Sequence, residues 1–542
     1  MKLVTVSEML AIEQEADQGG LDYATMMENA GRGLADEIEL LAHTEDTERE
    51  VLGLVGSGNN GGDTLVALAH LAADGWRARA YLVKREVEGD DLVERLKKEG
   101  GEIVLAEKDT QFDNLSAFIS TADVVVDGIL GTGIKLPLKK EVARVLEAVN
   151  KAIAELSWPP YVVAVDCPSG VNSDTGEAAE DVIPASLTVC MAAIKKGLLK
   201  FPAYDLVGEL RVVEIGLSNS VTAWKDINHF VADDEIVEDL LPLRPADSHK
   251  GTFGTALIAA GSINYIGAPL LAGRAAYRIG VGLVQLAVPG QVHLAIAGQF
   301  PEATWLLLPQ ELGVISQNAA DVLMKNFDRA TAVLVGPGLG QEDSTKLFIE
   351  NLLKGNAGSK KSTGRIGFTQ REVEKKTEQA THLPPMVVDA DGLRLLSKID
   401  GWSKLLPADS ILTPHPGEMA ALTGLDKDAI QADRLQIASK YAAEWGQIVV
   451  LKGAFTVIAA PDGRVTLIPV ATSALARAGT GDVLAGLIVG LRAQGLNAYD
   501  AAVAGAWIHA QAGLYAAEKV GAEASVMAGD VLEAVADVLS GF

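Results

Sequence analysis

A glycine-rich turn near the C-terminus carries the residues with the clearest chemical potential. Residues 478–486 read Ala-Gly-Thr-Gly-Asp-Val-Leu-Ala-Gly, and the pattern that follows predicts an amphipathic helix through Leu491. Backbone N–H groups at such a helix start attract anions, and small residues let a phosphate approach closely. The carboxyl group of Asp482 would not help to bind phosphate, so we expect it to accept or donate a proton beside one. The turn therefore indicates chemistry at the terminal phosphate of a nucleotide.

Three polar turns follow predicted strands in the first half of the chain. Residues 56–63 read Gly-Ser-Gly-Asn-Asn-Gly-Gly-Asp, and two further turns occupy 127–133 and 166–170. The first turn contains GxGxxG, which alone is a weak dinucleotide signal, and it adds two amides and an acid that this motif does not require. The ends of neighbouring parallel strands open onto one crevice, so the three turns predict one site.

The side chains of these turns divide into three expected roles. Asn60, Asp127 and Ser169 offer hard oxygen ligands to a cation. Backbone N–H groups of Gly131–Pro137 can bind a phosphate, with Lys135 adding charge, and Asp166 is left as an acid or base. Helix capping explains any one of these turns equally well, but the three together favour function.

Short Val, Ile and Leu runs alternate with helical patterns from end to end. Continuous apolar strands separated by helices predict parallel sheets covered on both faces, an α/β fold. The strands are expected at 51–55, 80–83, 123–127, 161–166, 187–190, 255–259, 284–288, 331–335, 386–389, 410–413 and 448–452.

The length of 542 residues predicts two or more domains. The first strand–helix series ends near residue 216 and a second begins after an acidic, proline-containing stretch, so we place domains at 1–222 and 223–542. Residues 355–382 are polar and locally basic, which favours an exposed insertion over a partner-binding arm.

Composition restricts the partners. A net charge of −26 argues against a nucleic acid or an anionic membrane surface as the main partner, and 48% hydrophobic content predicts a globular protein with ample core. Two cysteines require no disulfide framework. Thr5 and Glu8 predict a capping box at the start of a helix in place of a signal peptide, and the uncharged stretch 279–301 is interrupted too often to span a membrane. We expect a cytoplasmic protein that forms a homo-oligomer.

The first-half motifs resemble the epimerase domain of the NAD(P)H-hydrate repair enzymes, and residues 27–31 (Met-Glu-Asn-Ala-Gly) fit the same family. Thr64 departs from the family, which usually has glycine there. The resemblance implies a Rossmann-like three-layer αβα domain and a potassium ion held by Asn60, Asp127 and Ser169. It also implies that the hydrated cofactor contacts Asn59, Asn60, Gly61, Gly62, Asp63, Gly131, Thr132, Gly133, Ile134, Lys135, Leu136, Pro137 and Asp166.

The second half carries further motifs in a characteristic order. His249–Gly254 precedes the first strand, Gly336–Gly340 and Thr413–Glu418 follow later strands, and Gly479–Gly486 comes last. Together they resemble the ribokinase-like fold and, within it, the ADP-dependent NAD(P)H-hydrate dehydratases. The resemblance covers about Asp247 to Gly495 and implies an αβα domain with a largely parallel sheet.

This second resemblance implies roles for individual residues. Asp482 is the expected catalytic residue, and ADP with Mg²⁺ is the expected co-substrate. The adenine nucleotide would contact Lys452, Gly453, Ala454, Phe455, Thr456 and Gly481. The hydrated cofactor would contact Ala268, Gly338, His415 and Asp482.

Both site sets in one chain predict a bifunctional repair enzyme. It would interconvert the R and S hydrates of NADH and NADPH, then dehydrate the S form with ADP and release AMP and phosphate. One alternative is a ribokinase-like kinase of a vitamin precursor, fused to a binding or scaffold domain. A Rossmann dehydrogenase has only the GxGxxG fragment in its favour.

Overall fold

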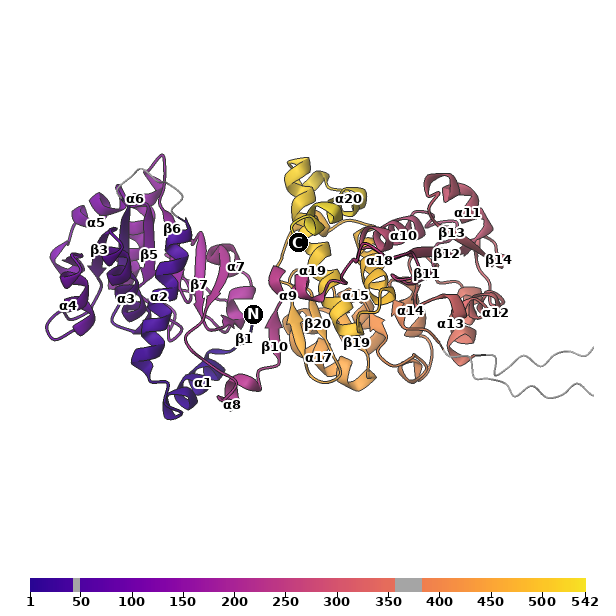
Figure 1. The fold of residues 1–542 in the computed structure, drawn as a ribbon, viewed down its shortest axis with the longest axis horizontal. Helices are drawn as coiled ribbons and strands as arrows, with labels where there is room; N and C mark the ends of the chain where they lie inside the picture. The colour runs from indigo at the N-terminus through magenta and orange to yellow at the C-terminus, as the bar shows by residue number, and fades with distance from the viewer. Residues whose placement is uncertain (42–48, 356–382) are drawn as a thin grey trace, which may run out of the picture. The chain divides into compact units, whose positions relative to one another are not determined.

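The computed structural model describes residues 1–41, 49–355 and 383–542 (Figure 1). It divides into two compact units, Met1–Val231 (unit 1) and Ala232–Phe542 (unit 2). The predicted boundary at 222/223 lies close to this division and stays a prediction for the two activities. Residues 356–382 of the predicted insertion lie outside the described residues.

Unit 1 is built on a parallel sheet with the strand order β4-β3-β2-β5-β6-β7-β9. The order reverses between β2 and β5, so the crevice beyond their carboxyl ends is the expected place for a ligand. A short parallel pair, β1 (Leu3–Val4) with β8 (Ile194–Lys195), lies apart from this sheet. The sheet strands are β2 (Glu50–Val55), β3 (Arg77–Leu82), β4 (Glu102–Leu105), β5 (Val124–Gly128), β6 (Tyr161–Val165), β7 (Leu187–Met191) and β9 (Glu209–Val213).

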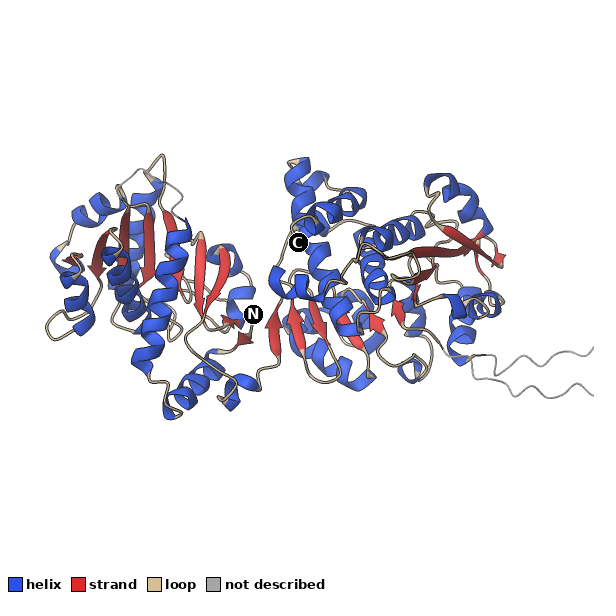
Figure 2. Ribbon diagram, in the orientation of Figure 1, coloured by secondary structure: helices blue, strands red, loops and turns tan. Residues whose placement is uncertain are grey.

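Helices cover both faces of this sheet (Figure 2). Side chains alternate along β2, with Val51 and Val55 packing into the core that holds α2 and α3, and Leu52 and Leu54 into the core that holds α5 and α6. This confirms the three-layer αβα sandwich. The helices are α1 (Val6–Gln18), α2 (Tyr23–Leu41), α3 (Asn59–Ala73), α4 (Asp91–Lys98), α5 (Asp113–Ile119), α6 (Lys140–Ala154), α7 (Tyr204–Val207) and α8 (Thr222–Lys225), and unit 1 ends in β10 (His229–Val231).

The sheet of unit 2 is parallel from β13 to β19 and ends in two antiparallel strands. Its order is β21-β20-β19-β18-β17-β16-β11-β12-β13, which confirms the largely parallel sheet. The strands are β11 (Thr255–Ala259), β12 (Leu283–Pro289), β13 (Thr304–Leu308), β16 (Ala332–Val335), β17 (Met386–Val388), β18 (Ile411–Leu412), β19 (Ile448–Leu451), β20 (Val457–Ala459) and β21 (Val465–Leu467), with a separate antiparallel pair β14 (Gln310–Glu311) and β15 (Val314–Ile315).

Helices also cover both faces of the second sheet. Ala256 and Ile258 of β11 belong to the core with α10, α18, α19 and α20, whereas Leu257 and Ala259 belong to the core with α12, α13 and α14. The helices are α9 (Asp234–Leu240), α10 (Ala268–Arg278), α11 (Gly290–Ile296), α12 (Ala319–Met324), α13 (Asp343–Lys354), α14 (Asp391–Leu396), α15 (Pro416–Thr423), α16 (Lys427–Ala432), α17 (Arg434–Trp445), α18 (Thr480–Ala493), α19 (Ala498–Val520) and α20 (Ala528–Leu539).

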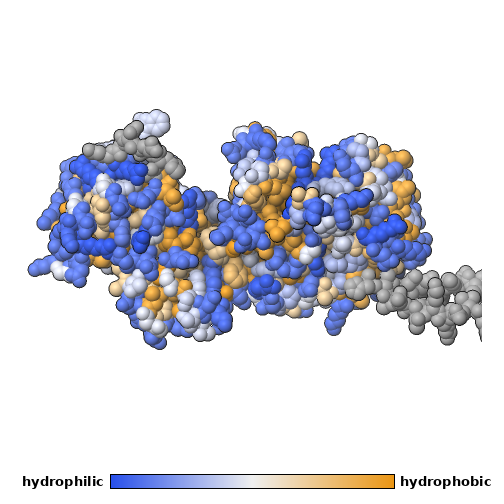
Figure 3. Space-filling model, in the orientation of Figure 1, coloured by the Kyte–Doolittle hydropathy of each residue, from blue (hydrophilic) through white to orange (hydrophobic). Residues whose placement is uncertain are grey.

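Local signals read from the sequence are present in the structure. The Thr5 hydroxyl accepts the Glu8 N–H at 3.1 Å, and the Glu8 carboxylate accepts the Thr5 N–H at 2.6 Å, which confirms the capping box of α1. Within the described ranges, none of the helices has the length and apolar character needed to cross a membrane. Hydrophilic side chains occupy most of the face visible in Figure 3, with smaller hydrophobic areas between them.

Candidate active sites

The first site lies beyond the carboxyl ends of β5 and β6 in unit 1. Asp127 is fully buried, and its carboxylate accepts the Ser169 N–H at 2.8 Å and the Ser169 hydroxyl at 2.6 Å. Burial raises the pKa of Asp127, although these hydrogen bonds oppose the shift. Within the described part of the chain, no Lys or Arg pairs with this carboxylate. A buried acid with this environment is suited to an enclosed cation.

Asn60 completes the set of oxygen ligands. Its side-chain N–H groups donate to the carbonyls of Val165 and Leu130, so its Oδ1 remains available as an acceptor. The Leu130 N–H donates to the Ser169 hydroxyl at 2.9 Å, which ties the turn after β5 to the turn after β6. Among the described residues no three His, Cys, Asp or Glu side chains gather as a metal cluster. One carboxylate with neutral oxygens fits a monovalent cation such as potassium better than a multiply charged metal.

Tight packing explains the glycines of the neighbouring turn. A Cβ at Gly56 would lie 1.9 Å from the Ile129 carbonyl oxygen, and one at Gly61 would lie 2.0 Å from the Gly56 oxygen. Thr64, where the resemblance implies glycine, lies beside Gly53 and Gly128, which have no side chain to obstruct it, and its hydroxyl donates to the Asn60 carbonyl at 2.6 Å. The departure therefore leaves the start of α3 intact.

The predicted phosphate-binding loop lies against this turn. A Cβ at Gly131 would meet Asn60 Oδ1 at 2.6 Å, so the loop begins directly beside Asn60. Gly61, Gly62 and Asp63 are buried in the first turn of α3, whereas Asn59 and Lys135 are exposed. The remaining loop residues, Thr132, Gly133, Ile134, Leu136 and Pro137, are half-buried or exposed.

Asp166 occupies a strained position directly after β6. Its φ of 63° is in the left-handed region, which non-glycine residues adopt rarely and which is common at strained functional positions. Its carboxylate accepts the Met191 N–H at 2.9 Å and forms an ion pair with Lys195, whose side chain is 1% exposed. Sequence reasoning missed Lys195, because it lies in a Lys-Lys pair that resembles ordinary surface sequence.

The second site is centred on Lys452 at the end of β19. Its Nζ lies 2.6 Å from Asp389 Oδ1 and 3.7 Å from Glu418 Oε2. The Thr413 hydroxyl also donates to Asp389 Oδ1 at 2.7 Å. Asp389 follows β17, Thr413 follows β18 and Lys452 follows β19, so parallel strands bring all three together. From the sequence, Asp389 was placed only at the end of an expected strand, 386–389, and no role was predicted for it.

Asp482 is in the first turn of α18, close to this cluster. Burial and the negative charge of Asp389 raise the pKa of Asp482 to about 7, although Lys452 opposes the shift. Unlike Asp389, it accepts no hydrogen bond from the described residues. Asp482 therefore titrates near neutral pH, where a general base is most effective.

A cavity of about 450 Å³ adjoins the start of α18. Five of the six residues predicted to bind nucleotide line it, namely Lys452, Gly453, Ala454, Thr456 and Gly481, and so does His415. Phe455, the sixth, is buried beside them. His509 of α19 also lines the cavity, and its Nε2 lies 2.9 Å from the Thr480 carbonyl oxygen. No sequence motif pointed to His509, which lies within the largely apolar helix α19.

The remaining predicted substrate contacts lie around the same strand ends. A Cβ at Gly338 would be 3.1 Å from Ala268 Cβ, so these two residues adjoin. Gly340 of the same loop donates its N–H to Asp391 at 3.0 Å. His415 Nδ1 accepts the Gly417 N–H at 2.9 Å, and Glu418 accepts the His415 N–H at 2.9 Å. His415 and Glu418 therefore cap α15 in addition to bordering the site.

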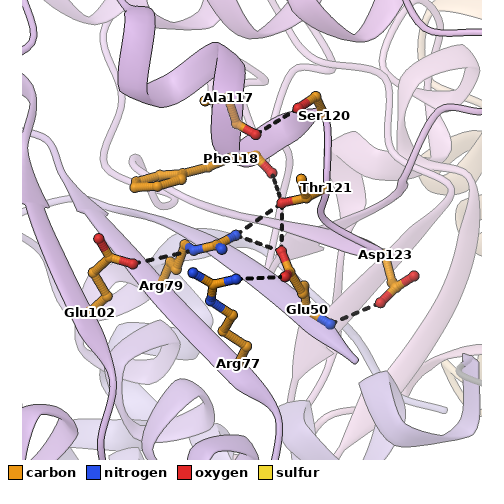
Figure 4. Close-up of polar contacts among 9 residues, drawn as sticks. All are labelled: Glu50, Arg77, Arg79, Glu102, Ala117, Phe118, Ser120, Thr121 and Asp123. Atoms are coloured by element: carbon orange, nitrogen blue, oxygen red, sulfur yellow. Dashed lines mark hydrogen bonds and ion pairs between the residues drawn. The ribbon is translucent and has the colours of Figure 1, made fainter. Parts of the chain in front are cut away.

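A separate polar cluster lies at the other end of the unit 1 strands, where β2 and β3 begin (Figure 4). Glu50 accepts hydrogen bonds from Arg79 at 2.7 Å, Arg77 at 3.1 Å and Thr121 at 2.5 Å. Arg79 is buried over the ring of Phe118, 4.8 Å from its centroid. The cluster lies where the strands begin, and the candidate site lies beyond their carboxyl ends. We therefore assign the cluster to stability and not to catalysis.

Comparison with protein families divides the chain in the same way. A family model described as YjeF-related protein N-terminus matches residues 23–197. A model described as NAD(P)H-hydrate dehydratase matches residues 256–359 and 367–536.

Full-length relatives carry both parts. A bifunctional NAD(P)H-hydrate repair enzyme Nnr from Moorella thermoacetica is 36% identical over 99% of this chain and 97% of its own length. One from Salinibacter ruber is 34% identical over 98% of this chain and 95% of its own length. Among solved structures, an ADP/ATP-dependent NAD(P)H-hydrate dehydratase from Bacillus subtilis, co-crystallized with ATP/Mg²⁺, is 30% identical, with a TM-score of 0.46 over 58% of this chain and 99% of its own.

Proposed function

Because this chain belongs to the family of bifunctional NAD(P)H-hydrate repair enzymes, we propose that unit 1 holds its epimerase site and unit 2 its dehydratase site. The protein is an NAD(P)H-hydrate epimerase and dehydratase. Each set of predicted residues gathers within one unit, at the carboxyl ends of parallel strands. A vitamin-precursor kinase fused to a scaffold is not favoured, because the relatives match both halves.

In unit 2, we assign the role of general base to Asp482, and we place the nucleotide-binding site in the cavity beside α18. The observation that carries this assignment is the position of Asp482, one residue after the cavity-lining Gly481 and within the field of Asp389 and Lys452. Asp482 would take the proton of the hydroxyl on C6 of the hydrated ring as that oxygen attacks the terminal phosphate of ADP. The N–H groups at the start of α18 would stabilise charge on the transferring phosphoryl group.

Phosphorylation makes the later elimination easy. Phosphate is a much better leaving group than hydroxide, so its loss restores the ring double bond and yields NAD(P)H, AMP and phosphate. Asp389 already forms an ion pair with Lys452, and Glu418 already caps α15, so neither carboxylate is free to hold a metal ion by itself. We therefore expect Mg²⁺ to enter bound to the nucleotide. Ala268, Gly338 and His415 would contact the hydrated cofactor.

In unit 1, we assign a potassium ion to Asn60, Asp127 and Ser169. Bound there, the ion would supply positive charge to a buried carboxylate and an electrostatic anchor for substrate oxygens. Asn59–Asp63 and Gly131–Pro137 would hold the hydrated cofactor, and Asp166 would act as acid or base. The predicted cytoplasmic location and homo-oligomeric state remain predictions.

Product analysis tests the dehydratase assignment. The protein is incubated with the S hydrate, ADP and Mg²⁺, and nucleotides are quantified by phosphorus NMR and mass spectrometry. One AMP and one phosphate should form for each NADH. Accumulation of a stable phosphorylated nicotinamide product would support the kinase alternative instead.

A further inference from the structure

Four ionisable side chains of unit 1 share one buried region next to the proposed cation ligands. They are Glu13 of α1, Asp63 of α3, Asp166 after β6 and Lys195 of β8. Each of the three acids lies within the electrostatic field of Lys195. The buried ammonium group of Lys195 thus lies near three acids. Among the described residues, only Asp166 forms an ion pair with it.

Lys195 is fixed more firmly than an ordinary lysine. Its side chain is 1% exposed, its Nζ binds Asp166 Oδ1, and the same Nζ donates to the Met191 carbonyl at 3.1 Å. The Met191 N–H donates to the same carboxylate. The backbone of Asp166 is in the left-handed region, so Lys195 and Met191 together hold a strained residue in one orientation.

Asp63 is the contrasting acid. The residue is 6% exposed, yet none of the described residues donates a hydrogen bond to its carboxyl group. Burial, with the charges of Asp166 and Glu13, raises the pKa of Asp63 well above its usual value. Asp63 therefore holds a proton more readily than an exposed aspartate, and its buried carboxyl group can act as a proton donor. The two acids are set apart by their environments, as an acid and a base must be.

We propose that Lys195 is a positioning residue of the epimerase site, which holds the Asp166 carboxylate in place as the base, and that Asp63 is the matching proton donor. This inference rests on the proposed function of unit 1. It assigns a role to a lysine and separates the roles of two acids within that site.

The chemistry of the substrate explains why two such groups are needed. C6 of the hydrate bears a hydroxyl and is bonded to ring nitrogen N1, so it is a hemiaminal carbon. Asp166 takes the hydroxyl proton, the C6–O bond becomes a carbonyl, and the C6–N1 bond breaks with its electron pair moving to nitrogen. N1 takes a proton from Asp63. Rotation about C5–C6 turns the aldehyde over, and ring closure on its other face returns both protons.

The balance of this sequence requires no other reactant. Asp166 gains one proton and Asp63 loses one on opening, and closure reverses both transfers. Lys195 fixes the Asp166 carboxylate for the first proton transfer, and burial of Asp63 favours its protonated form. Glu13, whose pKa is also raised by burial, contributes negative charge to the same region.

The test uses the full chain with pure R hydrate and excess ADP, and it measures the epimerase rate through the NADH that the unaltered unit 2 of the same chain forms. Lys195→Gln should lower epimerase kcat about 100-fold with KM changed less than threefold, and Lys195→Arg should recover part of the loss. Asp63→Asn should lower kcat by a similar factor. The adjacent Lys196→Gln, which removes only a 3.5 Å contact with Glu8, is the matched control and should retain the wild-type rate.

The pH profile separates a positioning role from a purely structural one. Wild-type epimerase kcat should fall at high pH as Asp63 loses its proton, and Asp63→Asn should lack this fall. Retention of more than half of wild-type kcat by Lys195→Gln would overturn the inference, as would a loss seen only in KM. If Lys195→Gln does not fold, as shown by circular dichroism, a wild-type rate in Asp63→Asn overturns it equally. Absence of epimerisation in the wild-type protein would instead contradict the proposed function.

Discussion

Each of the two sites contains one carboxylate that pairs with a lysine and one that does not. In unit 1, Asp166 pairs with Lys195, whereas Asp63 has no cation bound to it. In unit 2, Asp389 pairs with Lys452 and Asp482 does not. Burial raises the pKa of Asp63 and of Asp482, the acid of each site that has no lysine bound to it. In each site, therefore, one acid is held by a lysine and the other is left without a hydrogen-bond donor among the described residues.

The charge state of Asp482 makes a prediction for pH dependence. Its pKa of about 7 means that the base form is lost as pH falls below neutrality. Dehydratase kcat/KM should rise with pH through about 7 and then reach a plateau, because kcat/KM reports the free enzyme. Asp482→Asn should lower kcat about 1,000-fold and remove this dependence. An unchanged profile in the asparagine variant, followed by NADH absorbance, would assign the titration to another group.

The proposed potassium site makes a second prediction at this scale. Replacing potassium with tetramethylammonium should lower the epimerase rate at least tenfold, because a large organic cation cannot enter a site formed by buried Asp127 and Ser169. Dehydratase activity on the S hydrate, measured in the same buffers, is the control. Equal epimerase rates in both salts would reject the cation at these residues.

Site residues in the turns at the ends of predicted strands were found from the sequence. Lys195, which contacts the site from a different element, was not. Asp127 lies near the end of β5, and Asn60 and Ser169 lie in turns after other strands; hydrogen bonds link Ser169 to Asp127 directly, and to Asn60 through Leu130. Lys195 could not be predicted, because neither type nor spacing distinguishes it from the more exposed Lys196 beside it. Burial separates these two lysines, and burial at that point depends on the tertiary fold.

At the scale of elements, α18 combines an open start with a tightly packed middle. A Cβ at Gly486 would lie 2.3 Å from the Ala272 carbonyl oxygen of α10, so the two helices approach closely there. A Cβ at Gly481 would meet only Lys452 Nζ, at 3.7 Å. The two glycines therefore serve different purposes, close helix packing in one case and access to the N–H groups in the other.

This difference gives a paired prediction. Gly481→Ala should leave the melting temperature within about 2 °C and weaken ADP binding about tenfold or more, because the methyl group fills space needed by a phosphate. Gly486→Ala should instead destabilise the protein by about 1–3 kcal/mol, since the packed helices must separate. Calorimetry and thermal unfolding measure both. Tight ADP binding by a folded Gly481→Ala protein would place the nucleotide elsewhere.

The cluster around Glu50 tests the separation of stability from catalysis. Burial raises the pKa of Glu50, but hydrogen bonds from Thr121 and Arg79 outweigh it, and the net pKa is lowered. Glu50→Gln should destabilise unit 1 by about 2–3 kcal/mol at pH 7, because Arg79 loses its main partner. The ionised form is favoured by folding, so this difference should shrink as pH falls below about 4.

Urea unfolding of the two proteins at several pH values measures this effect. Glu94→Gln is a suitable control, because Glu94 pairs with Lys97 on the surface and should contribute little. Epimerase activity of the folded Glu50→Gln protein should match wild type. A selective loss of that activity would show that the cluster influences the site across the sheet.

The strands buried in the middle of the two sheets were the easiest elements to predict from the sequence. The strand at 255–259 matches β11, and most others differ by one or two residues at their ends. β4, β9 and β13 were not among the expected strands, and neither were β20 and β21, which are only three residues each and form an antiparallel addition to a parallel sheet. Ser410 was placed in a strand, but its N–H binds the Gln447 side chain at 2.7 Å, and β18 begins one residue later. Such side-chain competition has no periodic signature in the sequence.

For the whole molecule, the central claim is that two independent sites act on one damaged metabolite. Each unit has its own sheet, cores and catalytic carboxylates. Hydration at C6 yields two epimers, and a stereospecific dehydratase alone can repair only one of them. Fusion of the two activities in one chain makes both epimers recoverable.

The most direct measurement follows NADH absorbance during incubation of an equal mixture of R and S hydrates with excess ADP and Mg²⁺. Wild-type protein should recover the entire pool, whereas Asp166→Asn should recover the S half rapidly and then slow to the spontaneous rate. Wild-type recovery that stops at half would contradict an epimerase in unit 1. Complete rapid recovery by Asp166→Asn would contradict the site assigned to it.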